Sequence, residues 1–490
     1  MSRLASLASL ASIPFVLAAC ADVPSSSEED GQEESAGEEE SDSESDSGTG
    51  EQEGLAQTTT WHQHVAPIVA ERCGGCHRSE GIAPFSLGDY DSASQWAELG
   101  LEAIHAGTMP PFGAADTEEC APRLPFKDDP RLTEDQLALF EDWILDGKPE
   151  GDPDEAAPLP ELPDLDLADP DFHLEMEGDI TIEPGSDQFW CFVMDPELTE
   201  TTFIDGLQIT PDNDKIVHHV LLYLDEGGTQ SENLAGDDGR YECFGGPGLS
   251  NPTLLAAWAP GVPPTETPEA VAMNIPAGSR FVMNVHYHPT GVEEVDTSTG
   301  VDVRIEKGAP QYFGQLALIG NFSSSLGGGM DLQPGPNDST SNPEFRIPAG
   351  ISDHTETMIF RLPNSFPDVK LWSTGTHMHY VGTSMYIGLD RQEPEANTGI
   401  DAECLLNTPN YNFEWQRGYS YDAPLDEVPT AKAGDFIFME CGYDNSMGNP
   451  LVAEALDEQG LDAPVDVFLG EETLDEMCLG VFGIAYSIVP

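Results

Sequence analysis

Thr376-His377-Met378-His379-Tyr380 is the stretch of sequence from which the predicted fold is built outward. Side chains alternate between the two faces of an extended strand, so His377 and His379 point to the same side and can bind one metal ion. Two further groups of histidines precede this stretch, His218-His219 and His286-Tyr287-His288. Their recurrence predicts that the later part of the chain is a metal-binding β-protein.

The residues around these histidines have the composition of strands. From about residue 171 onward, short runs rich in Val, Ile, Phe, Tyr and Thr are separated by Gly, Pro, Asn and Asp. This pattern is typical of antiparallel sandwiches. The histidine groups divide this part in two, so we expect one sandwich domain over 171–308 and a second over 309–490.

The first group of histidines offers three imidazoles. His218 and His219 begin an apolar strand, and His286 lies in a second strand, with His288 as a spare on the same face. Adjacent strand residues face opposite sides, so His218 and His219 share one ion only where the strand is bulged or twisted. Three neutral imidazoles suit copper or zinc.

The second group needs a third ligand beside His377 and His379, and Met477 is the residue we select. A thioether is a soft ligand, so two imidazoles and one thioether favour Cu(I) over zinc, calcium or magnesium. Each side chain also has a plain alternative. An isolated His is more often a hydrogen-bonded core or surface residue, and a lone Met is more often part of the core.

Residues 58–150 have a different pattern, with apolar residues at helix spacing. They contain Cys73-Gly74-Gly75-Cys76-His77, the pattern in which two thiols attach a haem covalently and the histidine becomes an axial iron ligand. Met109 is the expected sixth ligand, because two following prolines stiffen its loop; a core methionine is the alternative. Rival ligands are His62, His64 and His105.

This segment is similar to a small class I cytochrome c. The competing interpretation of its two cysteines is a structural disulfide or half of a zinc site. No second Cys-x-x-Cys accompanies them, which disfavours zinc.

The first twenty residues predict export. Arg3 precedes a modestly apolar segment that ends in Leu17-Ala18-Ala19-Cys20. This resembles a bacterial lipoprotein signal, in which Cys20 becomes the lipidated N-terminus; an ordinary signal peptide is the alternative. We expect an extracytoplasmic protein, on the periplasmic face or the cell surface, held to the membrane by its lipid only, because no later run is long and apolar enough to span a bilayer.

The chain is strongly acidic, with 90 Asp and Glu against 18 Lys and Arg and a net charge of −72. Residues 21–57 predict an acidic disordered tether, and the proline-rich residues 151–170 predict an extended linker. So negative a surface repels nucleic acid, and we expect no such partner. It would attract a basic redox partner, although general solubility explains the charge equally well.

Through six short sequence motifs, residues 172–490 resemble the type II copper, ascorbate-dependent monooxygenases, the family of peptidylglycine α-hydroxylating monooxygenase and dopamine β-monooxygenase. In the order of that family they are Trp190-Cys191, His218-His219, Ala257-Trp258-Ala259, Val285-His286-Tyr287-His288, His377-Met378-His379 and Asp475-Glu476-Met477-Cys478. The resemblance implies two jelly-roll-like sandwiches that face each other across a solvent-filled cleft. The expected fold class is therefore a small all-α cytochrome c domain followed by two all-β jelly-roll-like sandwich domains.

The resemblance also implies two copper ions with different roles. The copper on three histidines stores and delivers an electron, and the other binds O2 and oxidises a substrate C–H bond. The implied ligands are His218, His219 and His286 for the first and His377, His379 and Met477 for the second. The implied disulfides are Cys191–Cys243 and Cys441–Cys478. Cys120 and Cys404 are left over, and they either form a bridge or stay free.

Two departures from the family concern the substrate. Peptide-hydroxylating relatives follow the Met-Cys pair with Asn and Tyr, whereas here Met477-Cys478 precedes Leu479-Gly480-Val481. They also carry Arg at the position of Gly375. The substrate class is therefore left open. The haem motif is a third departure, and we expect the haem to pass electrons to the three-histidine copper, replacing or supplementing ascorbate.

The function expected from the sequence is hydroxylation of a C–H bond of a small molecule by O2 and two copper ions. Electrons would come through one covalently attached haem c, from ascorbate, or from a periplasmic or surface redox protein. The first alternative is a non-catalytic electron-transfer or copper-binding protein. The second is a zinc protein with a structural or hydrolytic site, which explains neither Met477 nor the haem motif.

Overall fold

A computed structural model describes residues 58–488, apart from 80, 82, 163–165, 245, 260–261, 322–330, 339–342, 471 and 473. The predicted export signal, the lipidation site Cys20 and the tether 21–57 lie outside the described residues. Among the residues that are described, no helix is both long enough and apolar enough to cross a membrane.

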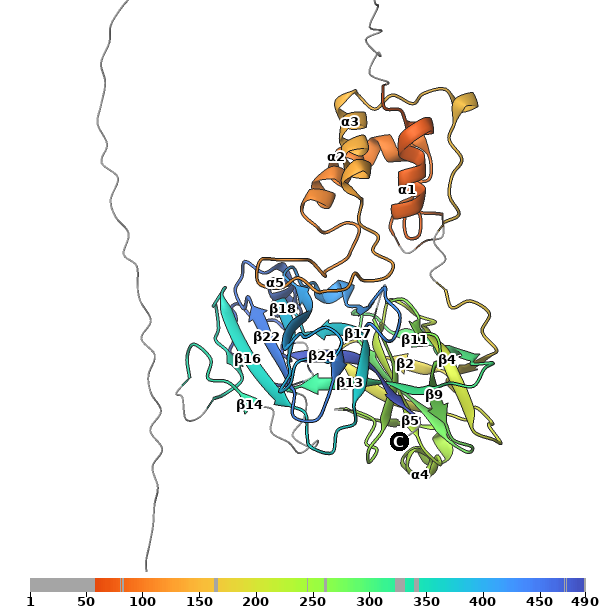
Figure 1. Ribbon diagram of the computed structural model, residues 1–490, viewed down its shortest axis with the longest axis vertical. Coiled ribbons are helices and arrows are strands. Elements are labelled where there is room, and N and C mark those ends of the chain that lie inside the picture. Colours follow the sequence, from red (N-terminus) through yellow and green to blue (C-terminus); the bar gives the residue numbers. More distant parts are fainter. Residues whose placement is uncertain are drawn as a thin grey trace, which may run out of the picture. The chain divides into compact units, whose positions relative to one another are not determined.

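Helices open the described chain and recur at a few later points (Figure 1). The α-helices are α1 (Ala66–Arg72), α2 (Tyr90–His105), α3 (Glu134–Leu145), α4 (Thr229–Ala235) and α5 (Pro450–Glu458). Shorter helical turns are η1 (Trp61–Val65), η2 (Pro153–Glu155), η3 (Gly236–Asp238) and η5 (Phe413–Trp415).

Side-chain caps set where the longer helices start. Asp89 accepts a hydrogen bond from the Ser92 amide at the start of α2, and Thr133 and Gln136 form a capping box at the start of α3. Trp143 of α3 is fully buried against η1 and α1. The predicted helical segments are therefore helices, and they bury one apolar face.

Strands dominate the rest of the chain. Those before residue 306 are β1 (Phe172–Glu175), β2 (Ile180–Ile182), β3 (Gln188–Met194), β4 (Thr202–Thr210), β5 (Val217–Asp225), β6 (Arg240–Glu242), β7 (Thr253–Trp258), β8 (Thr265–Glu266), β9 (Val271–Ile275), β10 (Arg280–Tyr287), β11 (Glu294–Asp296) and β12 (Gly300–Ile305). Those after it are β13 (Tyr312–Gly320), β14 (Asp331–Leu332), β15 (Arg346–Ile347), β16 (His354–Arg361), β17 (Val369–His377), β18 (Gly382–Asp390), β19 (Ala402–Thr408), β20 (Gly418–Ser420), β21 (Thr430–Ala431), β22 (Phe436–Tyr443), β23 (Val467–Phe468) and β24 (Leu479–Ser487).

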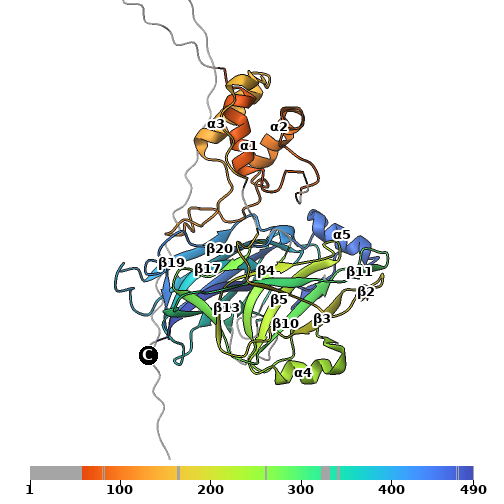
Figure 2. The same ribbon diagram turned by 90° about the vertical axis from the view of Figure 1, so that its right-hand side faces the viewer.

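A 15-stranded sheet connects both halves of the β-rich part (Figure 2). Its backbone path runs β1-β12-β4-β9-β13-β7-β5-β10-β3-β6, and β24 joins β13 to β17. β13 pairs antiparallel with β24 along nine residues and also pairs with β7 and β9 from the earlier half. Hydrogen bonds therefore cross the predicted boundary near residue 308.

Three apolar cores hold the strands together. One lies among β3, β4, β5, β10 and β12, and a second lies between the five-stranded sheet β14-β16-β22-β18-β19 and strands β17 and β24. The third is shared: Val282 of β10 and Leu316 of β13 pack with Trp372 of β17 and Ala485 of β24. Because burial of apolar area drives folding, this shared core makes the two halves one cooperative body.

The predicted fold class is wrong. Thr58–Pro490 forms one compact unit in which strands predominate, with no separate small all-α domain. After α2 the chain leaves the helices and packs on strands: Phe112 and Ala114 belong to the core of β17–β24, and Phe126 bridges to Tyr421. The sequence suggested independent domains because apolar periodicity reports local elements and not which of them share a core.

Disulfides support this arrangement. The two predicted bonds, Cys191–Cys243 and Cys441–Cys478, are both present and are confirmed. The two remaining cysteines, which the sequence left open, form Cys120–Cys404. This third bond ties the chain after α2 to β19, across 284 residues.

Candidate metal centre

The three-histidine group is assembled by a bulge in β5. His219 pairs with His286 of β10 and Val217 pairs with Tyr287, so His218 is an extra residue on its strand. A bulge re-aims side chains locally, and here it lets two consecutive imidazoles face the same ion site. The structure thus has the distortion that sharing requires.

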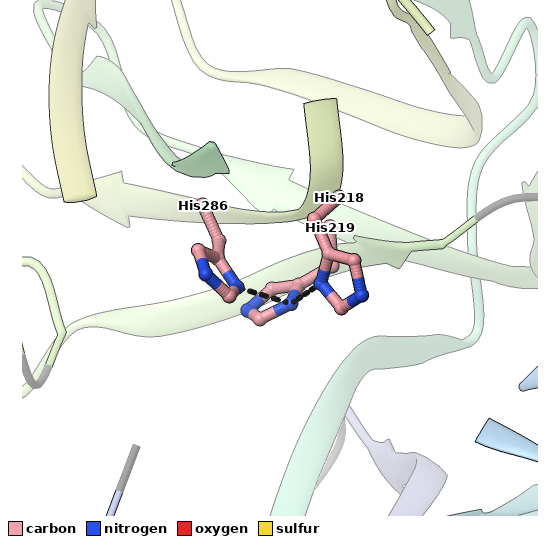
Figure 3. A group of neighbouring side chains, drawn as sticks. All are labelled: His218, His219 and His286. Carbon is pink, nitrogen blue, oxygen red and sulfur yellow. Dashed lines mark hydrogen bonds between the residues drawn. The ribbon is translucent and has the colours of Figure 1, made fainter. Parts of the chain in front are cut away.

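The three imidazoles converge through the same ring nitrogen (Figure 3). Nδ1 of His219 lies 3.2 Å from Nδ1 of His218 and 3.2 Å from Nδ1 of His286. One ligand atom from each residue lies within 4.8 Å of the others, so the group could hold a metal ion. Burial, followed by the neighbouring imidazoles, lowers the pKa of His218 and His219 well below the ordinary value, which keeps these rings in the neutral form that binds metals.

Asp187 lies behind this group and was not expected from the sequence. Its carboxylate accepts a hydrogen bond from Nδ1 of His288 at 2.7 Å and lies 3.5 Å from Nε2 of His286. His288 is thus held by a carboxylate, and its ring centroid is 6.2 Å from that of His218. A single Asp just before a strand has no motif that would have marked it.

The second group lies where β17 ends. His377 is the last residue of β17, and His379 follows in the turn beyond it, which differs from the expected continuous strand. Their ring centroids are still only 5.2 Å apart. Burial lowers the pKa of both rings, that of His379 to about 3, with His377 adding to the effect on His379.

Oxygen acceptors fix the orientation of these two rings. His377 donates from Nδ1 to Oε1 of Gln416 at 2.6 Å, and His379 donates from Nδ1 to the carbonyl of Asp475 at 3.0 Å. In each ring Nε2 is then the unprotonated nitrogen. Such acceptors are typical partners of metal-binding imidazoles.

Met477 is brought to this group through its backbone. It is buried, in the loop before β24, and its amide donates to the carboxylate of Glu476, which also accepts from the amide of His379. Tyr443 donates from its hydroxyl to the Met477 carbonyl at 3.0 Å, and the following Cys478 is bonded to Cys441. The three expected ligands of the second site therefore lie on adjoining segments.

The two histidine groups adjoin each other. The ring centroids of His219 and His377 are 6.4 Å apart. Phe413 of η5 stacks on His218 at 4.9 Å and lies 6.2 Å from the ring of His379. The resemblance implied a solvent-filled cleft between the groups, whereas the structure has five imidazoles and one phenyl ring in contact.

The haem-attachment segment has features that fit a haem. Cys73 and Cys76 are the free cysteines among the described residues, and the other six described cysteines form disulfides. Burial, followed by Cys76, raises the pKa of Cys73 to about 11. His77 donates from Nδ1 to the carbonyl of Phe85 at 3.1 Å, which leaves Nε2 for iron.

Met109 lines a cavity of about 230 Å³. Its walls are mostly apolar, from Ile104 and Leu132 on the helical side, and Cys73, Cys76 and His77 are not among the residues lining it. The structure therefore gives Met109 an apolar cavity but does not join it to His77.

The rival sixth ligands have other partners. His62 lies 3.4 Å from a carboxylate oxygen of Glu150 and His105 lies 2.9 Å from one of Glu141. His64 accepts through Nδ1 from the Thr60 amide at 3.1 Å. These contacts leave Met109 as the candidate we retain.

No family model and no curated protein matches the sequence. Among solved structures, PNGF-II has a TM-score of 0.25 and 11% identity, covering 64% of each chain. Broad bean stain virus has a TM-score of 0.23 and 8% identity, covering 62% of this chain and 76% of that one. The capsid protein P2 of bacteriophage PM2 has a TM-score of 0.22 and 8% identity, covering 65% and 98%. Similarity this low carries no argument about function.

Proposed function

We propose that the chain is a copper-dependent monooxygenase that hydroxylates a C–H bond of a small molecule with O2. One observation carries the proposal: imidazoles from three separate strands, β5, β10 and β17, gather in one place beside the loop that carries Met477. Neutral imidazoles with a thioether form a donor set that suits copper in both oxidation states and favours Cu(I) at the thioether.

The residues divide into two sets of ligands. Nδ1 atoms of His218, His219 and His286 would hold one ion. Nε2 atoms of His377 and His379, with the sulfur of Met477, would hold the other. Copper would supply one-electron transfer at the first set and O2 activation at the second.

Surrounding residues orient the ligands. Gln416 and the Asp475 carbonyl fix the tautomers of His377 and His379 by accepting their Nδ1 protons. Phe413 stacks on His218 and lies edge-on to His379, so it contacts a ring of each set. These side chains hold the imidazoles ready to bind metal before any ion arrives.

The electron supply is part of the proposal. Cys73 and Cys76 would hold a haem c, with His77 and Met109 as the candidate iron ligands, and the haem would supply single-electron transfer. Ascorbate or an extracytoplasmic redox protein would serve as reductant. A lipid on Cys20 would hold the protein at a bacterial membrane.

Isotopic oxygen tests the proposal directly. The copper-loaded chain is supplied with ¹⁸O2, a reductant and a pool of benzylic and amine compounds, and the products are analysed by mass spectrometry. We expect one ¹⁸O atom per hydroxylated product, and loss of that label in His377→Ala. Reductant oxidation without labelled product would contradict the oxygenase and favour the non-catalytic electron-transfer protein. Hydroxylation that persists with zinc in place of copper would contradict both the copper monooxygenase and the non-catalytic electron-transfer protein.

A further inference from the structure

Glu476 is a fully buried carboxylate at the junction of the two segments that carry the ligands of the second metal site. It directly precedes Met477 in sequence. The isolated bridge between Leu469 and Glu476 anchors the start of this loop, and β24 begins just after it. The side chain therefore points inward from a loop that is fixed at both ends.

One oxygen of this carboxylate contacts both ligand segments. Oε1 accepts a hydrogen bond from the amide of Met477 at 2.7 Å and another from the amide of His379. The backbone N–H groups of Val381 and Gly382, which follow His379, also favour the charged form of this carboxylate and lower its pKa. A single side chain thus gathers amides from the end of β17 and from the Met477 loop.

Other contacts also join these segments: Nδ1 of His379 donates to the Asp475 carbonyl at 3.0 Å, and β17 pairs with β24 from His377 and Leu479 onward. Tyr411 donates to the Met378 carbonyl at 2.6 Å, which fixes the histidine segment. Tyr443 donates to the Met477 carbonyl, and the Cys441–Cys478 bond fixes the residue after it. Both of these latter contacts tie the Met477 loop to β22, whereas Glu476 ties it to the histidines.

Burying a carboxylate costs free energy, because the charged group loses its hydration. Burial raises the pKa of Glu476 to about 8, because the backbone amides offset only part of the lost hydration. Its second oxygen, Oε2, has no hydrogen-bond partner. Such a group is retained where its geometry serves a site, which is the reason to look for a role beyond packing.

We propose that Glu476 is a positioning residue: it holds the sulfur of Met477 in register with the imidazoles of His377 and His379, so that a thioether joins them as a metal ligand. This inference rests on the proposed function, because it assumes that Met477 binds copper. Without Glu476, the hydrogen bonds from His377 to Gln416 and from His379 to the Asp475 carbonyl remain, and the Met477 amide loses the carboxylate that it shares with the His379 amide.

Glu476→Gln is the informative variant, because it keeps size and burial while it removes the negative charge and leaves one neutral carbonyl oxygen, a weaker acceptor for the amides of His379 and Met477. The full chain is loaded with Cu(I), and X-ray absorption at the copper edge reports nitrogen and sulfur neighbours separately. We expect the sulfur contribution of the wild type to disappear in Glu476→Gln while the nitrogen contribution remains. Cu(I) affinity at this site should fall about 10- to 100-fold.

Glu356→Gln is the matched control. Glu356 is also buried and also has an oxygen without a partner, but its carboxylate contacts Nε2 of His354 at 2.7 Å and accepts from neither His379 nor Met477. We expect this variant to lose stability and to keep the sulfur contribution. Equal loss of sulfur in both variants would overturn the proposal, as would a wild-type sulfur contribution and Cu(I) affinity in Glu476→Gln.

A second readout needs no metal. Amide hydrogen exchange of the copper-free chain should accelerate around residues 376–382 and 475–478 in Glu476→Gln and stay unchanged there in Glu356→Gln. If Glu476→Gln does not fold, Glu476→Asp replaces it, because the shorter carboxylate reaches one segment but not both; unchanged exchange and sulfur signal would then overturn the proposal. A wild-type spectrum without sulfur would instead refute the assignment of Met477 in the proposed function.

Discussion

The two histidine groups present different ring nitrogens to their sites. His377 and His379 have Nδ1 engaged by oxygen acceptors, whereas His218, His219 and His286 turn Nδ1 toward one another. The hydrogen bond at one ring nitrogen decides which nitrogen binds metal. Gln416 and the Asp475 carbonyl therefore direct Nε2 of His377 and His379 to their site.

Tyr287 is a residue whose stabilising role can be tested without metal. It follows His286, is fully buried, and donates from its hydroxyl to Oδ2 of the fully buried Asp296 at 2.6 Å. Burial, and then the Asp296 charge, raises the pKa of Tyr287 far above its ordinary value, so the hydroxyl stays protonated and donates.

Tyr287→Phe should lower the free energy of unfolding by about 1.5–3 kcal/mol, because a buried carboxylate loses its charge-assisted donor. Urea unfolding of the metal-free chain measures it. Tyr90→Phe is the control, since that half-buried hydroxyl donates to the neutral carbonyl of Lys148 at 2.9 Å and should cost less than about 1 kcal/mol. Equal costs for the two variants would contradict the account of Tyr287.

At the scale of elements, the segment 411–416 links the histidine groups. The Tyr411 hydroxyl accepts from the Met378 amide and donates to the Met378 carbonyl. Phe413 stacks on His218, and Gln416 accepts from His377. The sequence analysis assigned this segment no chemical role. Its role appears once the end of β17 that carries His377 and the start of β5 that carries His219 lie close together, which no local pattern predicts.

A second pair of elements, the loops before β5 and before β12, is joined by Asp212. Its carboxylate accepts from the amide of Thr297 at 2.9 Å and from its hydroxyl at 2.8 Å. These hydrogen bonds, the side-chain one first, lower the pKa of Asp212 below its ordinary value. A carboxyl with a lowered folded pKa stabilises the fold above its unfolded pKa, and the contribution is lost as the pH falls through the folded pKa.

Asp212→Asn should therefore be less stable than the wild type at pH 6 by roughly 0.5 kcal/mol, a small value because solvent screens an exposed carboxylate. The difference should shrink as the pH is lowered below about 4, the ordinary Asp pKa. Urea unfolding at a series of pH values measures it. A difference that widens toward low pH would contradict the assigned direction.

At the scale of the whole chain, local patterns predicted elements and motifs but not how they assemble. The helices near Trp61 and Trp143, the strand-rich part and the histidine groups follow from periodicity and residue type. The shared core of Val282, Leu316 and Trp372 does not, because it joins residues far apart in sequence whose individual patterns are those of ordinary strands. This is why a helical domain and two sandwich domains were expected where Thr58–Pro490 forms one unit.

The site, like the fold, was predictable in its local motifs but not in how they assemble. Short motifs that contain metal-binding residue types identified His218, His377 and their neighbours, and the family resemblance suggested Met477 and the disulfides. Glu476 was part of one of these motifs but had no role assigned to it, and no motif marked Asp187. Carboxylates are common in a chain with 90 of them, so only their burial and contacts distinguish these two.

Metal content of the purified full chain tests the central claim most directly. Elemental analysis after expression with copper and haem available should give two copper atoms and one iron atom per chain. His219→Ala and His377→Ala should each remove one copper and leave the iron unchanged. Stoichiometric zinc in place of copper, or a copper content that neither substitution lowers, would contradict the claim that these histidines form two copper sites.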